Sequence, residues 1–324
     1  MQSRDQLVVR YLSEGDIAAL EIAPGKMADA IGRAFEARAA GNVQIPPKVI
    51  LRQPDGADFY AMTVSVSNSM SGVKWVAGNM PASSAASPPS FVGLIILSET
   101  VTGRPRAILS AASITADRTA ATSLLAARHL ARADAQTIGL VGSGAQARAH
   151  LRAFAAEYPL SRALLYGRGE TNLAATEQLA RDLGLETERC DQVETLLPRS
   201  DILISSVTPR SGMPPILDAS LLPGGAFASM VDHGASWLPE ATRGLDGLHT
   251  DDLAATLDRS AVEPHLQEMS IDADFSSIGG RFRRTSEEER LGFVFAGTAL
   301  ADLAVCEAIL DAAQRSDVGV MLAL

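Results

Sequence analysis

The apolar positions follow two different patterns along the chain, and the first pattern covers the initial third. Ser13 and Asp16 form an S-x-x-D helix start. Pro24 suits the first turn of a second helix, which ends at Gly41. The apolar face of this helix is Met27, Ile31 and Phe35. Short apolar runs then predict β-strands at 48–53, 59–64, 72–77, 91–97 and 105–110, and the Ser, Ala and Pro residues of 81–90 predict a loop.

From residue 115 onward, helices alternate with short apolar runs. An Ala-rich helix is predicted over 115–133, and strands that alternate with helices after it predict βαβ units and a parallel sheet. The apolar runs are TIGLV, ALLYG, DILISSV, GAFASMV, GLHTD and LGFVF, with a helical piece between the fourth and fifth and a long helix, GTALADLAVCEAILDAAQ, at the end. The expected fold is α/β, with a Rossmann-type parallel-sheet domain and a smaller α+β domain.

Composition and charge narrow the classes of partner. The 324 residues include 28 Lys+Arg and 38 Asp+Glu, a net charge of −10, which argues against binding to nucleic-acid phosphates or to anionic lipid. Two distant cysteines, Cys190 and Cys306, exclude a disulfide scaffold, and five scattered histidines predict no catalytic metal. Without a signal-like or spanning apolar run, the expected protein is soluble and cytoplasmic, with no membrane partner.

One motif carries most of the predicted chemistry. The sequence GSGAQA at 142–147 has the form G-x-G-x-x-A, follows a strand-like run and opens a helix, as a dinucleotide-binding turn requires. The alternative is a glycine turn without a ligand. If a nucleotide binds, its phosphates meet free N–H groups and the positive end of the helix dipole. The predicted cofactor contacts are Gly142, Ser143, Gly144, Ala145, Gln146 and, just after DILISSV, Thr208.

The end of the next apolar run bears on which nicotinamide nucleotide is bound. An NAD site has an acidic residue about 20 residues after the glycines, where it holds the ribose hydroxyls. Here that place has Gly167 and Arg168, and an arginine suits a 2′-phosphate. The sequence therefore favours NADP modestly over NAD. The alternative is that Arg168 stacks on adenine or points into solvent.

Four segments together resemble the ornithine cyclodeaminase/mu-crystallin family. They are SGVKW (71–75), DRTAATSLLAARHLA (117–131), GLVGSGAQA (139–147) and GTALAD (297–302), they occur in the family's order, and the match covers nearly the whole chain. Within the family, GVKW and AARHLAR are most similar to the branch of siderophore-pathway dehydrogenases that form 2,3-diaminopropionate. The resemblance implies a homodimer whose substrate-binding and dimerisation domain is 1–116 with 297–324, and whose Rossmann NAD(P)-binding domain is 117–296.

The resemblance also implies roles for three basic residues. Arg118 and Arg52 would bind the substrate carboxylate, because a guanidinium fits a carboxylate through two hydrogen bonds. Lys74 would polarise the reacting C–N bond or move a proton, if burial lowers its pKa. The alternatives are a surface position for Arg52, a cap or salt bridge for Arg118, and a solvated side chain for Lys74.

The sequence indicates less clearly which residue is the proton donor or acceptor of the site. Family members carry an Asp after the fifth Rossmann strand, and counting back from Glu240 sets that position on Gly234. Asp232 is the nearby carboxylate at the strand end, so we predict it as the proton donor or acceptor, with His233 as its rival. Asp302 in GTALAD fits the family pattern, either facing the active site or forming a cap or ion pair.

These features predict an NAD(P)-dependent oxidoreductase that acts on the C–N bond of a small-molecule substrate, an amino acid or its imine. The 2,3-diaminopropionate-forming reaction and a ketimine or pyrroline-carboxylate reductase are both open within it. The departure at Gly234 weakens ornithine-type cyclodeamination more than it weakens amine oxidation or imine reduction. The remaining alternative is a mu-crystallin-like protein that binds NADPH and a small ligand.

Overall fold

In the computed structural model, which describes residues 7–54, 57–78, 92–208, 213–260 and 263–324, each of two units contains its own β-sheet. The first unit is Met1–Arg118 with Thr298–Leu324, and the second is Thr119–Gly297. The predicted loop at 81–90 lies outside the described residues. Within the described ranges, no helix is both long and apolar enough to cross a membrane.

The sheet of the first unit is mixed. Its order is β15-β1-β7-β6-β5-β4-β2, with β3 paired to β4. Among the strands that the structure describes in this unit, β1 and β7 pair in parallel and the other pairs are antiparallel. The strands are β1 (Val8–Leu12), β2 (Val43–Gln44), β3 (Val49–Leu51), β4 (Asp58–Val66), β5 (Met70–Gly78), β6 (Val92–Glu99), β7 (Pro105–Ser110) and β15 (Val320–Ala323).

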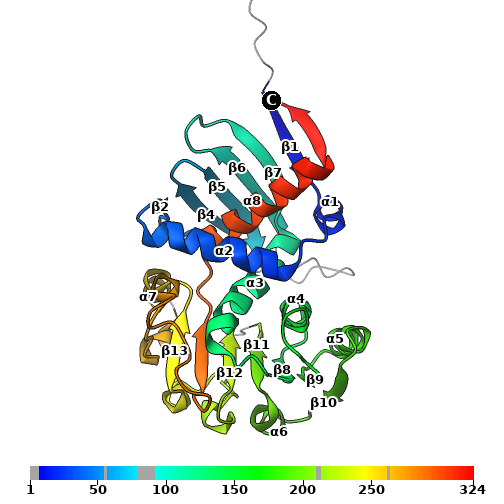
Figure 1. Cartoon of the computed structure of the whole chain (residues 1–324), viewed down its shortest axis with the longest axis vertical. Coiled ribbons are helices and arrows are strands. Elements are labelled where there is room, and N and C mark those ends of the chain that lie inside the picture. The colour runs from blue at the N-terminus through cyan, green and yellow to red at the C-terminus, as the bar shows by residue number, and fades with distance from the viewer. Residues whose placement is uncertain (1–6, 55–56, 79–91, 209–212, 261–262) are drawn as a thin grey trace, which may run out of the picture. The chain divides into compact units, whose positions relative to one another are not determined.

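Two helices, α2 (Pro24–Ala39) and α8 (Ala299–Ser316), lie across this sheet (Figure 1). The predicted stripe of α2, Met27, Ile31 and Phe35, is buried, as residues at helical spacing on one face should be. The short helix α1 (Glu14–Ala19) begins at the predicted capping box, in which Ser13 and Asp16 bond each other's backbone N–H. The long helix α3 (Ala112–Leu130) follows β7 and leads into the second unit.

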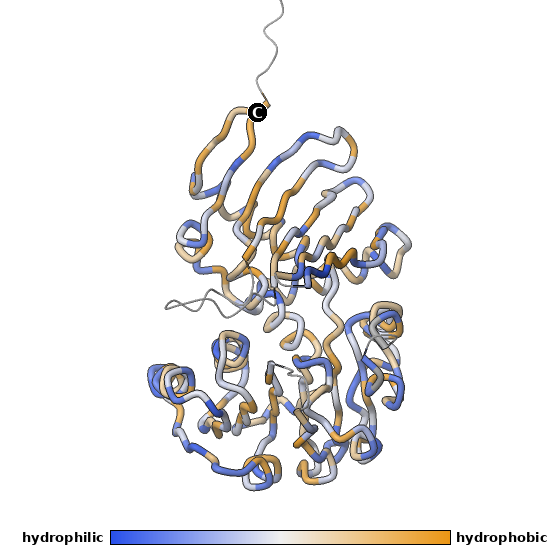
Figure 2. Tube along the Cα trace, turned by 180° about the vertical axis from the view of Figure 1, so that it is seen from behind, coloured by the Kyte–Doolittle hydropathy of each residue, from blue (hydrophilic) through white to orange (hydrophobic). Residues whose placement is uncertain are grey.

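The two faces of the first sheet differ in exposure. On β5 and β6, Lys74, Val76, Ile95 and Leu97 are buried, whereas the residues between them point to the opposite face. That opposite face is apolar, and Figure 2 shows apolar stretches along the strands of this unit. Its exposed members are Val49, Leu51, Trp75, Val92, Leu94 and Ile96, which we call the outer apolar face.

The sheet of the second unit is parallel throughout, with the order β10-β9-β8-β11-β12-β14-β13. Its order reverses between β8 and β11, the switch point at which such sheets bind ligands. The predicted α/β fold, a Rossmann-type parallel sheet with a second domain, is confirmed. The strands are β8 (Thr137–Val141), β9 (Arg162–Tyr166), β10 (Glu186–Arg189), β11 (Ile202–Ser205), β12 (Phe227–Met230), β13 (Gly247–Thr250) and β14 (Leu291–Val294), and the helices are α4 (Ala145–Ala155), α5 (Glu170–Asp182), α6 (Val193–Leu196) and α7 (Leu253–Ser260).

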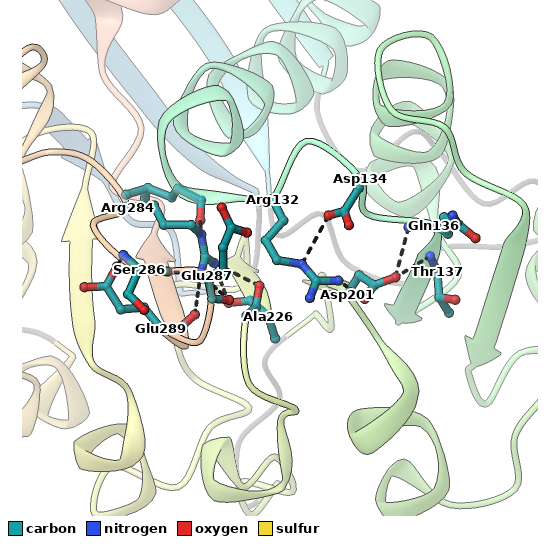
Figure 3. A network of polar contacts seen from close by, with 12 residues as sticks. Arg132, Asp134, Gln136, Thr137, Asp201, Ala226, Arg284, Ser286, Glu287 and Glu289 are labelled. Carbon is teal, nitrogen blue, oxygen red and sulfur yellow. Dashed lines mark hydrogen bonds and ion pairs between the residues drawn. The ribbon is translucent and has the colours of Figure 1, made fainter.

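Hydrogen bonds and ion pairs hold together the loops at the amino edge of the parallel sheet (Figure 3). Asp201, just before β11, accepts hydrogen bonds of 2.9 Å from the backbone N–H groups of Gln136 and Thr137 and pairs with Arg132 at 3.0 Å. Arg284 donates to backbone carbonyls, including that of Glu289 at 2.6 Å. These contacts satisfy backbone groups of the loops at the amino edge, whereas open parallel sheets bind their ligands at the carboxyl edge.

Four strands, β1, β2, β10 and β15, escape the sequence prediction, and one predicted helical piece is shorter than an α-helix. β1 and β15 pair with each other from the two ends of the chain, and β10 reads ETER, with no apolar residue to signal a strand. The piece between β12 and β13 is only a 3₁₀ turn, Ala241–Gly244. The predicted strand 105–110 coincides with β7.

Candidate functional site

Lys74, Arg118 and Asp302 form a buried cluster in the first unit. Lys74 Nζ and Arg118 Nε each lie 2.9 Å from the same oxygen, Asp302 Oδ1. Lys74 is on β5, Arg118 on α3 and Asp302 in the first turn of α8, on the helix-covered side of the sheet. Lys74 is therefore not a solvated surface residue, and Asp302 forms an ion pair.

Burial sets the electrostatics of this cluster. It lowers the pKa of the Lys74 ammonium; Asp302 opposes this shift and the positive Arg118 adds to it. Lys74 and Arg118 both contact the same oxygen of Asp302. The lowered pKa makes proton transfer from Lys74 easier than from an ordinary lysine.

Glu14 fixes the start of the helix that carries Arg118. Its carboxylate accepts hydrogen bonds of 3.1 Å from the backbone N–H groups of Ala112 and Ser113, and another from the Ser110 hydroxyl. Burial acts to raise the pKa of Glu14, but these hydrogen bonds outweigh burial and lower it. Glu14 thus caps α3 from outside the helix, and Arg118 lies two turns further along.

Arg52 is not brought to this cluster. It follows β3, whose register sets Leu51 against Phe59, whereas Lys74 lies opposite Met62 one strand further on. Its side chain is exposed. Its predicted role as a second carboxylate-binding arginine stays a prediction.

The glycine turn of the second unit has the geometry of a nucleotide-binding loop. Gly142, after β8, has φ +100°, and a Cβ there would lie 2.8 Å from the Ser206 carbonyl oxygen. A Cβ on Gly144, the N-cap of α4, would meet nothing within 4 Å in the described chain, and no side chain caps this helix. The start of α4 therefore offers free N–H groups beside an open backbone, which fits a pyrophosphate.

A series of hydrogen-bonded, buried polar side chains contacts the start of the helix that follows this turn. His150 Nδ1 lies 2.8 Å from the Gln146 carbonyl oxygen, its Nε2 lies 2.9 Å from Ser123 Oγ, and Ser229 donates to Ser123. Burial lowers the pKa of His150 to about 4, so the ring is neutral at physiological pH. A neutral ring with one N–H donor and one acceptor satisfies both contacts.

The remaining predicted cofactor contacts occupy the same carboxyl edge. Ser143 is buried, and its carbonyl accepts from Arg148 and Thr176, each at 3.0 Å. Arg168 follows β9 and is exposed, as is Thr208 after β11. The nearest acid, Glu170, is paired with Arg189. The end of β9 therefore presents an arginine and no unengaged carboxylate among the described residues.

Asp232 is fully buried at the end of β12. Its Oδ1 accepts a 2.8 Å hydrogen bond from Ser205 Oγ, which itself accepts from Trp237 Nε1 at 2.9 Å. Burial raises the pKa of Asp232, so the protonated form is favoured more than in an ordinary aspartate. Gly234, where the family's usual aspartate would stand, has φ +76° and packs against Met269.

His233 lies beside Asp232, and its backbone is in the left-handed region, with φ +57°. Its Nδ1 is 2.7 Å from the Phe295 carbonyl oxygen, just after β14. Asp232 and His233 thus come from one strand end and face different surroundings. No group of three or more His, Cys, Asp or Glu residues in the described part of the chain is arranged to hold a metal ion.

Sequence reasoning missed two features of these sites. Asp251, after β13, accepts hydrogen bonds from the backbone N–H groups of Ala296 and Gly297, and Ser205 with Trp237 surrounds Asp232. The available signal was position, since Asp251 and Ser205 both lie at carboxyl ends of strands of the parallel sheet, where ligands bind.

Known proteins resemble this chain over most of its length. The solved structure of Thermococcus litoralis Delta(1)-pyrroline-2-carboxylate reductase in complex with NADH and L-proline is 25% identical, with a TM-score of 0.86 over 96% of this chain and 99% of that one. The alanine dehydrogenase of Archaeoglobus fulgidus is 25% identical over 90% of this chain and 91% of its own length. The ornithine cyclodeaminase of Agrobacterium fabrum is 26% identical over 76% and 70%.

These relatives differ in activity, so they do not select one reaction for this chain, and the 2,3-diaminopropionate-forming branch stays a prediction. The family itself is defined by a sequence model, described as the Ornithine cyclodeaminase/mu-crystallin family, that matches residues 12–316. Because that match spans nearly the whole chain, the protein belongs to the ornithine cyclodeaminase/mu-crystallin family.

Proposed function

We propose that the protein is an NAD(P)-dependent oxidoreductase acting on the C–N bond of an amino acid or its imine. In this proposal, residues 1–116 with 297–324 bind the substrate and form a dimer, and residues 117–296 bind the nucleotide. The observation that carries the proposal is the buried Lys74–Asp302–Arg118 cluster. A protein whose role is only to bind a nucleotide would not need two buried cations against one carboxylate, because burying charged side chains costs free energy.

Each basic residue has a defined task in the reaction. Arg118, with Arg52 as a second candidate, binds the substrate carboxylate and so orients its Cα. Lys74, whose pKa is lowered by burial, takes the proton from the substrate nitrogen as the C–N bond becomes C=N, or returns it in the opposite direction. A bound nicotinamide would accept or supply the hydride at Cα.

Asp232 and His233 are the candidates for the second proton transfer. When an imine is hydrolysed, a water molecule must lose a proton, and a neutral histidine or an aspartate can accept it. Asp232 is buried and its pKa is raised, which suits an acid; His233 is only half-buried, which suits exchange with water. We assign His233 to exchange with water and Asp232 to proton donation.

The nucleotide is proposed to be NADP in preference to NAD. Arg168 stands where an NAD site has its acid, and the neighbouring Glu170 is paired with Arg189. Arg148, on the first turn of α4, adds a second guanidinium beside Asn172. These groups favour a 2′-phosphate over a free hydroxyl.

The functional assembly is proposed to be a homodimer that covers the outer apolar face. Trp75 and Leu94 are paired across β5 and β6 and are 44% and 43% exposed, so a large apolar side chain faces water on each strand. An exposed apolar surface of several strands is typical of an interface between subunits. A second copy of the same face would bury it.

A single panel of assays tests the proposed activity. Purified protein is incubated with NADP or NAD and with small amino acids, then with reduced nucleotide and cyclic imines, while absorbance of the reduced nicotinamide, ammonia and proline are followed. Net change in reduced nicotinamide is the expected result. Ammonia and proline without net reduction would instead identify cyclodeamination. Tight nucleotide binding with neither outcome would leave a mu-crystallin-like binding protein and overturn the proposal.

A further inference from the structure

Asp251 holds the loop that follows β14. Its side chain is 1% exposed; Oδ1 accepts a 2.7 Å hydrogen bond from Ala296 N–H and Oδ2 accepts one of 2.9 Å from Gly297 N–H. Gly297 has φ +77°, so the backbone turns sharply at this point. One carboxylate thereby fixes two successive peptide groups.

The peptide group next to Ala296 determines how His233 is protonated. His233 Nδ1 lies 2.7 Å from the Phe295 carbonyl oxygen, and a carbonyl can only accept. Nδ1 must therefore carry a proton, and in the neutral ring Nε2 is the nitrogen that can take up another. The Phe295 carbonyl belongs to the same peptide unit as the Ala296 N–H that Asp251 holds. The two contacts thus act on opposite ends of one rigid group.

We propose that Asp251 is a positioning residue for His233: by fixing the Phe295–Ala296 peptide, it holds the proton on Nδ1 and makes Nε2 the proton acceptor. This inference rests on the proposed function, in which His233 exchanges protons with water. Among the described residues, the charged and titratable neighbours include Asp252, beside Asp251, and His265, whose Nε2 contacts the His233 carbonyl oxygen at 2.9 Å.

The titration of Asp251 agrees with this geometry. Burial raises its pKa to about 6; the negative charge of Asp252 adds to the shift, and the hydrogen bonds from Ala296 and Gly297 oppose it. A proton on Asp251 removes an acceptor from one of the two peptide N–H groups. The hold on the loop should therefore weaken as the pH falls through about 6.

The test compares Asp251→Asn with Asp252→Asn in the full chain. Asp252 is a similarly buried neighbour whose carboxylate accepts from Ala255 N–H in α7. Histidine is labelled with ¹⁵N, and the ring nitrogen shifts of His233 are read at pH 8. We expect the Nδ1–H tautomer in the wild type and in Asp252→Asn, and a mixture of tautomers in Asp251→Asn.

Kinetics supply the second readout. Asp251→Asn should lower kcat about tenfold, move the acidic limb of the pH–rate profile and change KM less than twofold. Asp252→Asn should leave kcat and KM unchanged and move the acidic limb only slightly to lower pH, because the negative charge of Asp252 adds to the raised pKa of Asp251. An unchanged His233 tautomer in folded Asp251→Asn overturns the inference. If that variant does not fold, the wild type is titrated instead: the His233 ring nitrogens and the Gly297 amide should share an inflection near pH 6, and its absence overturns the inference. The spectra need no turnover, so an inactive protein with the expected tautomer would refute the proposed function alone.

Discussion

Lys74 and Asp302 are 228 residues apart in sequence, yet their side chains form a 2.9 Å salt bridge in which neither is more than 3% exposed. Arg118 shares the same oxygen of Asp302. An ion pair buried this deeply stabilises a fold little compared with apolar residues of the same size, but it is very sensitive to the loss of one partner. The cluster is therefore better explained by chemistry than by stability.

Asp302→Asn should destabilise the protein by about 3 kcal/mol, because it leaves two buried cations without their carboxylate. The measurement is urea unfolding at pH 7. Glu307→Gln is the control, since Glu307 is on the same helix, is less buried and accepts a hydrogen bond from the neutral Ser69 hydroxyl. It should change the free energy of unfolding by less than about 0.5 kcal/mol. Equal effects of the two variants would contradict the assigned role of Asp302.

Lys74→Met should lower kcat/KM by a factor of roughly 10² to 10⁴, the usual contribution of a positioned acid or base. Nucleotide affinity should not change, because Lys74 belongs to the other unit. Steady-state kinetics and a fluorescence titration with reduced nucleotide measure the two quantities. Lys26→Met, at an exposed position on α2, is the matched control. Retained activity in Lys74→Met would show that Lys74 is not the group that transfers the proton.

Arg168→Ala should weaken NADPH binding about tenfold or more and leave NADH binding nearly unchanged, because only the former has a 2′-phosphate for a charge-assisted hydrogen bond. Calorimetric titration with both nucleotides gives the ratio of dissociation constants. Arg162→Ala serves as the control, since Arg162 is at the amino end of the same strand and pairs with Glu186. A loss that is equal for both nucleotides would argue against recognition of the phosphate.

The stability of the protein should depend on His150 between about pH 4 and pH 6.5. Burial lowers its pKa from 6.5 to about 4 in the folded state, so over this range the unfolded chain binds more protons, and stability falls as the pH falls. The contribution is complete above pH 6.5 and amounts to about 3 kcal/mol. Urea unfolding from pH 7 to 4 should show a shallower slope for His150→Gln than for the wild type. Parallel slopes would contradict this assignment.

Trp75→Asp should convert the proposed dimer into monomers without unfolding either unit, because it sets a charge in the middle of the outer apolar face. Sedimentation velocity at several concentrations reports the assembly, and circular dichroism reports the fold. Leu183→Asp, at a similarly exposed apolar residue of the second unit, should not alter the assembly. Dimers of Trp75→Asp as stable as those of the wild type would assign the interface to another surface.

Much of the fold could be predicted because its signals are local. The run TIGLV, the glycine turn and the helix after it are contiguous, so sequence spacing alone indicates β8, the loop and α4. Alternation along β5 likewise sets Lys74 on the face opposite Trp75. The partners of Lys74 could not be derived in this way, since its contact with Asp302 joins residues that only the folded sheet and α8 bring together. Asp251 had only its position at a strand end as a signal, and its partners could not be derived, because they are backbone groups of a loop 45 residues away.

The pairing of β1 with β15, in which Val8 lies opposite Ala323, also sets an order of events during synthesis. Lys74 leaves the ribosome long before Asp302, and at 5–20 residues per second the interval is roughly ten to forty-five seconds. During that time Lys74 has no Asp302 carboxylate with which to pair, and the first sheet lacks both β15 and α8. The second unit is contiguous and can fold while the first waits. A newly made chain should therefore form the parallel-sheet unit before it acquires the Lys74–Asp302–Arg118 cluster.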